Sequence, residues 1–433
     1  MAEIKPIRAW RYNPSLANKI EELTAPLFDV VSDKQRQKLY ESPYNSIHLS
    51  VPQGSNPAAK AKQLLDSWKG NGVLEQDVIP GIYVYYQYFK LAGSPKEYCR
   101  KGFVCHIRAY NWKENVILRH ENTIPKAVND RIELLEQTEL HASPTHGLYT
   151  DPNFELEKYM DEAIQTPLYE TEDYQGVRDV LAVIQDAKII QCFIDLIDPL
   201  KIILADGHHR YESSLVLKEK YATRNPNHTG KEGYNYHLMY LTNTEAGDLR
   251  ILPTHRLIHG IKNFSEKEVI EKLEIDFDVK VFENADTLNE IIMGKKWAFG
   301  IILKNHSLKV RLKPESINKM TWHFPQEIKN LDLTVLHYFI IEKIFGILGK
   351  DQRESEKISF ERNFSACLEM VHQGEVQMAV VTQEVSIEGV KQVCASGYTM
   401  PQKSTYFYPK VISGFLFSSI NESEFQSLPY SRF

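Results

Sequence analysis

Residues 205–211 place an acid, a glycine, two histidines and an arginine next to one another. The largely apolar residues 201–205 precede them and predict a buried strand, and residues 208–224 have the composition of a helix. A glycine between a strand and a helix permits a positive φ, and the helix start directs N–H groups and the positive end of its dipole at one point. The pattern therefore predicts an anion site, where an arginine can hold phosphate with two nitrogens.

The predicted phosphate ligands at this turn are Gly207, His208, His209 and Arg210. Asp206, at the end of the strand, would orient a nucleophile, hold a metal ion or set the tautomer of a histidine. The alternative is an ordinary turn in which Asp206 caps the helix. A zinc-type site is disfavoured, because adjacent residues point in different directions and metal ligands are usually spaced further apart.

A second polar segment, residues 397–410, contains lysines and hydroxyl groups around an aromatic centre between two prolines. This composition suits a nucleotide phosphate or a substrate carboxylate, and Lys403, Ser404 and Thr405 are the candidate ligands. A rigid surface loop with solvated lysines explains the same residues equally well.

Three carboxyl or imidazole groups stand outside these segments. Asp29 lies among apolar residues, where a carboxylate either has a partner or has the raised pKa of a base, although a helix cap is the simpler interpretation. His120 stands beside Glu121, a pair that could carry out acid–base catalysis or be a plain surface pair.

Two further segments contain basic residues. Lys126 and Arg131 follow His120 and Glu121, and His255 and Arg256 follow Thr254. Thr254, His255 and Arg256 would complete a phosphate clamp, or they would make ordinary structural contacts.

Composition limits the class of protein. The chain has 433 residues, a hydrophobic fraction of 42% and a formal net charge of -6, which favour a folded protein and disfavour nucleic-acid binding through bulk positive charge. Its 5 cysteines are scattered and fit a reducing compartment. Neither a secretory signal nor a membrane-length apolar run is found, so a cytoplasmic protein with no membrane partner is expected.

A chain of this length is expected to form two or three lobes. The boundaries that we predict are residues 1–150 for an N-terminal α/β lobe, 151–262 for the lobe that carries the phosphate-binding turn, and 263–433 for a C-terminal α/β lobe that contributes the second polar segment.

Local patterns predict several elements of secondary structure. Residues 81–91 and 102–110 are expected to be paired strands, residues 46–51 a half-buried strand, residues 142–153 a loop or lobe boundary, and residues 174–190 helix and turn.

Six segments, in one order over essentially the whole chain, resemble the family called domain of unknown function 1015. They are Lys5-Pro6-Ile7-Arg8-Ala9, Ala25-Pro26-Leu27-Phe28-Asp29-Val30, Tyr44-Asn45, Ala205-Asp206-Gly207-His208-His209-Arg210-Tyr211-Glu212, Leu252-Pro253-Thr254-His255-Arg256 and Met400-Pro401-Gln402-Lys403-Ser404-Thr405.

The Asp-Gly-His-His-Arg turn resembles the Gly-x-His-Arg phosphate-binding turn of the ParB/sulfiredoxin superfamily. That resemblance implies an α+β (mixed α/β) fold, with a nucleotide-binding core and additional mixed-sheet lobes. Sulfiredoxin needs a cysteine inside the turn, and this chain has His208 there. Repair of sulfinic acid is therefore disfavoured.

In the free serine kinases of that superfamily, a similar turn binds nucleotide phosphates and a carboxylate deprotonates serine. The resemblance implies a phosphotransferase that acts on serine or O-phosphoserine with ADP or ATP, in serine biosynthesis. It gives Asp206 and His209 catalytic roles, with Mg²⁺ held by Asp206.

The separate base of those kinases has no matching motif in this chain. Asp29, Glu121 and Glu212 are the candidates, and Glu212 and His120 are also expected to contact the substrate. Two other hypotheses remain: a nucleotide-binding regulatory or partner-binding protein without catalysis, and a metal-dependent phosphohydrolase that uses His208, His209 and His120. The oligomeric state is not predicted.

Overall fold

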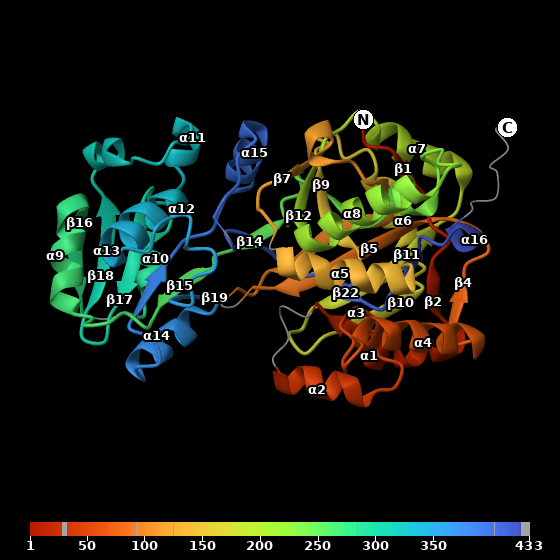
Figure 1. Ribbon diagram of the computed structural model, residues 1–433, viewed down its shortest axis with the longest axis horizontal. Helices are drawn as coiled ribbons and strands as arrows, with labels where there is room; N and C mark the ends of the chain where they lie inside the picture. The colour runs from red at the N-terminus through yellow and green to blue at the C-terminus, as the bar shows by residue number, and fades with distance from the viewer. Residues whose placement is uncertain (28–32, 92–93, 124, 284, 402, 426–433) are drawn as a thin grey trace. The chain divides into compact units, whose positions relative to one another are not determined.

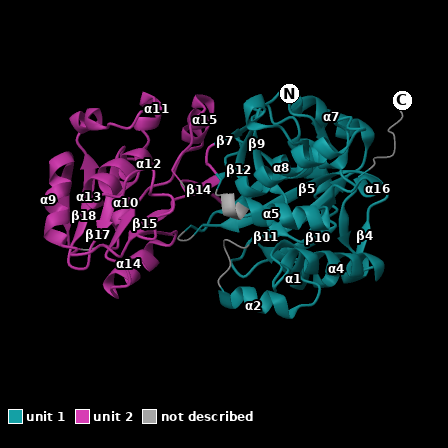
Figure 2. Ribbon diagram, in the orientation of Figure 1, with its two compact units in different colours: residues 1–119, 123–249, 409–433 teal, residues 120–122, 250–408 magenta. Residues whose placement is uncertain are grey.

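The computed structural model describes all residues except 28–32, 92–93, 124, 284, 402 and 426–433. It forms two compact units, shown in Figure 2. Unit 1 contains residues Met1–Arg119, Thr123–Leu249 and Pro409–Phe433, and unit 2 contains His120–Asn122 and Arg250–Tyr408. Helices and mixed sheets occur together, which confirms the predicted mixed α/β class.

Unit 1 is built on a mixed sheet to which the described residues contribute 9 strands (Figure 1). In sheet order these are β10 (Tyr169–Glu172), β11 (Arg178–Ile184), β5 (Ile82–Lys90), β6 (Glu97–Arg108), β13 (Tyr236–Asn243), β9 (Thr145–Tyr149), β12 (Ile202–Asp206) and β7 (Ile117–Arg119), with β1 (Ile4–Lys5) also pairing with β6. The pairs β12–β7 and β13–β9 are parallel, and the other pairs are antiparallel.

The predicted boundary at residue 150 differs from this arrangement. Strand β9, which precedes residue 150, lies between β12 and β13, which follow it. Residues on both sides of the boundary therefore share one sheet. The chain instead passes into unit 2 near residues 120 and 250 and returns to unit 1 at Pro409.

Alternation along β5 explains how this sheet is covered on both faces. Ile82, Val84 and Tyr86 belong to a core cluster with α6 (Glu157–Ala163), α7 (Ala187–Ile197) and α8 (His208–Arg224). Tyr83 and Tyr85 belong to another cluster, with α1 (Ile20–Leu23) and α4 (Pro57–Gly70). Successive side chains of a strand point to opposite faces, so one strand supplies both cores. The predicted pairing of residues 81–91 with 102–110 is confirmed by the β5–β6 register.

Residues 46–51 were predicted as a strand, and this is wrong. They contain the short helix α3 (Ile47–Ser50). The Asn45 side chain accepts a hydrogen bond from the Ile47 N–H at 2.9 Å, and its amide donates to the carbonyls of Glu22 and Thr24, each at 2.8 Å. These side-chain bonds to the backbone fix a helical turn that alternating polarity does not reveal.

Two other predictions of secondary structure are also wrong. The expected loop or lobe boundary at residues 142–153 contains β9, and most of the expected helix and turn at residues 174–190 is β11, with α7 beginning only at Ala187. In β9, Gly147 allows close packing, since a Cβ there would come within 2.5 Å of the Met239 sulfur. Strand pairing on both sides outweighs a composition of Ser, Pro, His and Gly. The apolar part of β11 is too short for periodicity to separate strand from helix.

Unit 2 has its own antiparallel sheet, to which the described residues contribute 6 strands. In order they are β16 (Phe277–Phe282), β18 (Ser307–Leu312), β17 (Ala298–Ile302), β20 (Met378–Val381), β15 (His255–Ile258) and β19 (Ile358–Glu361). Helices α9 (Glu266–Asp276), α10 (Leu288–Ile292), α14 (Phe364–His372), α11 (Gln326–Lys329) and α15 (Ile387–Ser396) belong to the same unit. A π-helical segment, Leu336–Glu342, joins α12 (Asp332–Val335) to α13 (Lys343–Phe345).

The remaining helices and small sheets complete the two units. The remaining helices in unit 1 are α2 (Asp33–Glu41), α5 (Pro125–Thr138) and α16 (Glu422–Phe425). Three strand pairs also belong to unit 1: β2 (Trp10–Tyr12) pairs with β4 (Leu74–Gln76), β3 (Ala25–Pro26) pairs with β22 (Ile412–Ser413), and β8 (Leu140–His141) pairs with β23 (Ser418–Ser419). In unit 2, β14 (Arg250–Leu252) pairs with β21 (Tyr406–Tyr408).

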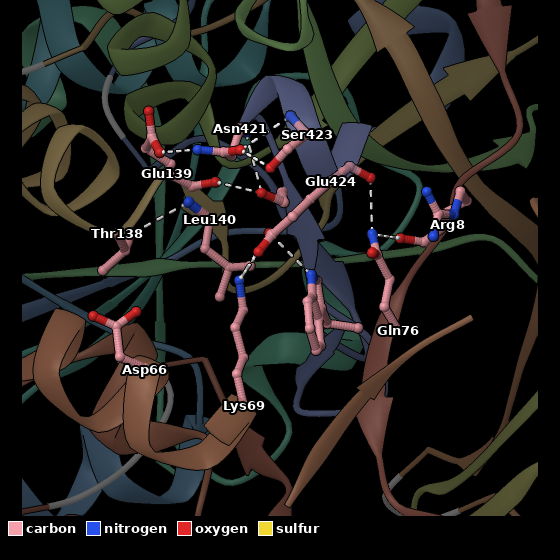
Figure 3. A network of polar contacts seen from close by, with 12 residues as sticks. Arg8, Asp66, Lys69, Gln76, Thr138, Glu139, Leu140, Asn421, Ser423 and Glu424 are labelled. Atoms are coloured by element: carbon pink, nitrogen blue, oxygen red, sulfur yellow. Dashed lines mark hydrogen bonds and ion pairs between the residues drawn. The ribbon is translucent and has the colours of Figure 1, made fainter. Parts of the chain in front are cut away.

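Polar contacts fasten the returning C-terminal segment to the rest of unit 1 (Figure 3). Lys69 of α4 forms an ion pair of 2.7 Å with Glu424 of α16, and the Gln76 side chain donates to the Glu424 carbonyl at 2.8 Å. The Asn421 amide donates to Glu139 at 2.7 Å. The described residues from Pro409 to Phe425 are therefore an integral part of unit 1.

Among the described residues, no helix is both long and apolar enough to cross a bilayer.

Candidate functional site

The turn between β12 and α8 has the geometry that its sequence predicts. Strand β12 ends at Asp206, helix α8 begins at His208, and Gly207 between them has a φ of 89°. A Cβ on Gly207 would lie 2.6 Å from Thr145 Cγ2 and 2.9 Å from Arg210 Nη2. Only glycine fits this position without strain, because both the backbone angle and the space exclude a side chain.

Asp206 lies between two cations. Its Oδ1 accepts a hydrogen bond from Lys410 Nζ, and its Oδ2 accepts one from Arg210 Nη2 at 3.1 Å. Burial by itself would raise the pKa of Asp206, but the charges of Lys410 and Arg210 outweigh it and hold the pKa well below its usual range. Asp206 is therefore a carboxylate at neutral pH and a poor proton acceptor. Its geometry suits the positioning of Arg210 and Lys410.

Arg210 and Arg131 line one small cavity in unit 1, of about 50 Å³. A single water needs roughly 10–15 Å³ on this measure, so the space is large enough for several waters or one small anion. Arg210 Nη1 donates to Ser143 Oγ at 2.8 Å, and Arg131 Nη1 donates to the Ser50 carbonyl at 2.7 Å. Burial and the charge of Arg210 lower the pKa of Arg131. The described lining residues include no acid, so the cavity suits an anion.

Lys410 holds its position through its main chain. Gln87 Nε2 donates to the Lys410 carbonyl at 3.0 Å, and Arg100 Nη2 donates to the carbonyl of Pro409. Gln87 also donates to Asp179 Oδ1 at 2.8 Å. Burial raises the pKa of Asp179 to about 7, although hydrogen bonds from Tyr85 and Gln87 oppose the rise. A buried polar network thus fixes the lysine that faces Asp206.

Lys410 and Arg131 stand in the sequence only as parts of longer polar segments, and neither is a predicted ligand. Lys410 and Asp206 are 204 positions apart in the chain. Composition gives no signal for such a pair. For Arg131 the usable signal is a basic residue among interleaved charged and apolar residues, a segment that forms α5.

His208, His209 and Glu212 are the other residues of α8 that the sequence predicts for the site, and they differ in burial and contacts. His208 is buried with an exposed fraction of 7%, and His209 is half-buried. Both lie in the first turn of the helix. Glu212 accepts a hydrogen bond from Trp112 Nε1 at 2.6 Å, a contact that fixes α8 against the segment before β7. The predicted substrate role of Glu212 has no support in this contact.

Thr254, His255 and Arg256 are buried inside unit 2. Arg256 Nη1 donates to the Thr254 carbonyl, and Arg256 Nε donates to His337 Nε2 at 3.3 Å. His255 Nδ1 accepts from the Thr382 N–H at 3.2 Å. Burial lowers the pKa of Arg256 to about 10, and the charge of Glu121 opposes that shift. These contacts give the three residues a structural role within the unit.

The second polar segment is held by the His120–Glu121 pair, also within unit 2. Glu121 Oε1 accepts from the Ser404 N–H at 3.0 Å and from the Thr405 N–H at 3.3 Å. His120 Nε2 lies 2.7 Å from Thr405 Oγ1. Lys403 has a φ of 53°, in the left-handed region. Two segments that were predicted separately thus form one group, and Glu121 supports the loop.

The predicted residues therefore fall into two groups, one in each unit. Unit 1 brings together Asp206, Gly207, Arg210 and the unpredicted Lys410 and Arg131. Asp29, a predicted base, lies outside the described residues.

The surroundings of Asp206 do not suit its predicted role as a ligand of Mg²⁺. Mg²⁺ needs several oxygen ligands around it, whereas both oxygens of Asp206 accept hydrogen bonds from cations. Over the described part of the chain, no group of three or more His, Cys, Asp or Glu side chains is arranged to hold a metal ion.

Comparison with known proteins gives one family match. Residues 4–334 match the family described as "Protein of unknown function (DUF1015)". The curated proteins contain no match.

Solved structures with some similarity include a conserved hypothetical protein from Pyrococcus furiosus, with 12% identity, a TM-score of 0.37, and coverage of 73% of this chain and 95% of that chain. A free serine kinase in complex with AMP has 15% identity, a TM-score of 0.36, and coverage of 74% and 92%. C-terminally truncated SbnI from Staphylococcus aureus has 12% identity, a TM-score of 0.34, and coverage of 72% and 85%. Likeness at this level carries no argument about activity.

Proposed function

This chain belongs to the family described as "Protein of unknown function (DUF1015)", and from that premise we propose that it is a phosphotransferase acting on serine or O-phosphoserine with an adenine nucleotide. One observation carries the proposal. Arg131 and Arg210 line one anion-sized cavity beside a strand–glycine–helix turn. The likeness of that turn to the phosphate-binding turn of free serine kinases supplies the substrate class.

In this proposal the phosphate lies at the N-terminus of α8. Arg210 and Arg131 contact its oxygens from the cavity, and backbone N–H groups after Gly207 add donors. The bound phosphate attracts the Lys410 ammonium group partly away from Asp206, and Lys410 then stabilises the negative charge of the transferring group. Asp206 keeps both cations in place.

The chemical step moves the phosphoryl group between the serine hydroxyl oxygen and the terminal phosphate oxygen of ADP. In one direction serine and ATP give O-phosphoserine and ADP, and in the other O-phosphoserine and ADP give serine and ATP. His209, half-buried in the first turn of α8, is the proposed group that moves the hydroxyl proton. Asp29 stays a candidate for the same role on sequence grounds.

The second candidate function is nucleotide binding without catalysis. The depressed pKa of Asp206 and its two cationic partners favour a stable binding clamp over a proton acceptor. The metal-dependent phosphohydrolase hypothesis has less support, because His208, His209 and His120 belong to no group of three or more His, Cys, Asp or Glu side chains that is arranged to hold a metal ion within the described residues.

The test is phosphoryl transfer measured by ³¹P NMR with ATP and L-serine, and separately with ADP and O-phospho-L-serine, each with and without MgCl₂. We expect transfer by the wild type, and a loss of at least about 100-fold in Arg210→Ala and His209→Ala. Arg311→Gln, an exposed arginine of unit 2, is the matched control and should react as the wild type does.

Absence of transfer in both directions would contradict the proposed reaction. If ADP still binds in that case, the binding function is favoured. Unchanged turnover in Arg210→Ala would remove the turn as the active site.

A further inference from the structure

Unit 2 contains a cavity of about 670 Å³ that the proposed function does not use. Every residue that lines it belongs to unit 2. Sites for small organic ligands usually measure about 300–1,000 Å³. The cavity is therefore large enough for a molecule of one or two rings, whereas the cavity beside Arg210 is not.

Aromatic side chains form much of its wall. Trp322, Phe324 and Phe360 line the cavity, and the rings of Trp322 and Phe324 meet edge to face with centroids 5.8 Å apart. Trp322 is fixed by a hydrogen bond of 3.1 Å from its Nε1 to Glu342 Oε2. Flat, fixed aromatic surfaces favour a ring-bearing ligand.

The charged groups of the wall are mainly basic. Lys350 and Arg353 line the cavity, and the acid among the described lining residues is Glu342. Glu342 Oε2 already accepts hydrogen bonds from Trp322 Nε1 and from the Gly349 N–H, the latter at 2.7 Å. One oxygen of the acid is thus engaged within the protein, and two cations against one acid leave the cavity with an excess of positive charge.

Arg353 provides a second, independent observation. Its Nη2 is buried and has no hydrogen-bond partner within the described residues. A buried cationic N–H without an acceptor is unfavourable, so native proteins rarely leave one unsatisfied. An anion in the cavity would supply the missing acceptor.

Hydrogen bonds fix His337 and Gln352 in the polar part of the wall. His337 lies on the π-helical segment Leu336–Glu342, with its Nδ1 2.8 Å from Gln352 Oε1 and its Nε2 accepting from Arg256. Single turns of π-helix occur frequently at functional sites. Met400 and Pro401 also line the cavity, so the second polar segment forms part of its wall.

We propose that this cavity binds a small organic anion with an aromatic ring, with the ring against Trp322, Phe324 and Phe360 and the carboxylate or phosphate at Arg353 and Lys350. This site lies in unit 2 and is independent of the proposed phosphoryl transfer.

The test is isothermal titration calorimetry on the full chain with 2-naphthoate, 1-naphthyl phosphate and the neutral 2-naphthalenemethanol. We expect at least one of the two anions to bind at least tenfold more tightly than the alcohol. The tighter of the two identifies the preferred acid group. Arg353→Gln should weaken binding of that anion at least tenfold, and Phe360→Leu should weaken binding of the anion and the alcohol alike.

Two controls locate the ligand. Arg311→Gln and Arg210→Gln should bind the preferred anion as the wild type does. If Arg353→Gln does not fold, as judged by its melting curve, Lys350→Gln replaces it with the same expectation. The proposal is overturned if neither anion binds, if the alcohol binds as tightly as the anions, if the Arg353 or Lys350 variant binds like the wild type, or if Arg210→Gln abolishes binding.

Discussion

The Asp206–Arg210 turn in unit 1 and the Thr254–Arg256 segment in unit 2 contain similar chemical groups in different surroundings. At the turn, the chain leaves a strand and starts a helix, and Arg210 lines a cavity. Arg256 lies inside a sheet, on β15, with an exposed fraction of 0%. Its donors are used by Thr254 and His337. An arginine next to a histidine therefore has room for a ligand only where the fold leaves a cavity beside it.

The largest effect is expected at Arg256. Arg256→Ala removes a buried cation and leaves His337 and Glu121 without its charge, so the free energy of unfolding should fall by about 3–5 kcal/mol. Arg210→Ala should lower it by only about 1–2 kcal/mol, since Arg210 is partly exposed and its lost hydrogen bonds can be replaced by water. Chemical denaturation followed by circular dichroism measures both. Equal losses would contradict the distinction between the two arginines.

How much of this contrast the sequence could predict depends on the range of each interaction. The strand, Gly207 and the start of α8 are adjacent in the chain, so their geometry is encoded locally. The pairing of Lys410 with Asp206 joins distant positions through the return of the chain to unit 1.

The burial of Arg256 could not be predicted from the residues next to it in the sequence either, because it depends on β19 and β20, which pair with β15 on either side. The same limit explains β9, whose Ser, Pro, His and Gly predict a loop until its neighbours in the sheet are known.

The next effect concerns Gly207. Gly207→Ala combines a left-handed backbone, which is unfavourable by about 1–2 kcal/mol for other residues, with contacts to Thr145 and Arg210 that add about 1–2 kcal/mol more. Gly176→Ala is the matched control in unit 1, because Gly176 has a φ of +76° and a Cβ added there would meet open space. Thermal unfolding should show roughly twice the loss for Gly207→Ala. Equal losses would mean that the turn is not tightly packed.

A smaller effect is expected from pH, with opposite signs at two carboxyl groups of unit 1. Because the pKa of Asp206 is depressed, its stabilising contribution is complete above the ordinary aspartate pKa of about 3.9 and is lost as the pH falls below it. Because the pKa of Asp179 is raised to about 7, stability falls as the pH rises from about 3.9 toward 7.

Unfolding free energies between pH 3 and pH 8 test both signs. In Asp206→Asn the unfolding free energy should fall less in acid than it does in the wild type. In Asp179→Asn the unfolding free energy should no longer fall as the pH rises toward 7. Each difference from the wild type should be about 1–3 kcal/mol. A stabilising effect of the Asp179 charge at pH 8 would contradict the burial argument.

The central claim is that the turn of unit 1 binds nucleotide phosphate with Arg210 and Arg131. Calorimetric titration of the full chain with ADP tests it most directly, with Arg210→Gln, Arg131→Gln and the control Arg311→Gln. We expect ADP to bind the wild type and the control equally, and each cavity variant at least about tenfold more weakly, since a charge-assisted hydrogen bond is worth about 1.5–3 kcal/mol. Failure of the wild type to bind ADP, or equal affinity in all four proteins, would contradict the account.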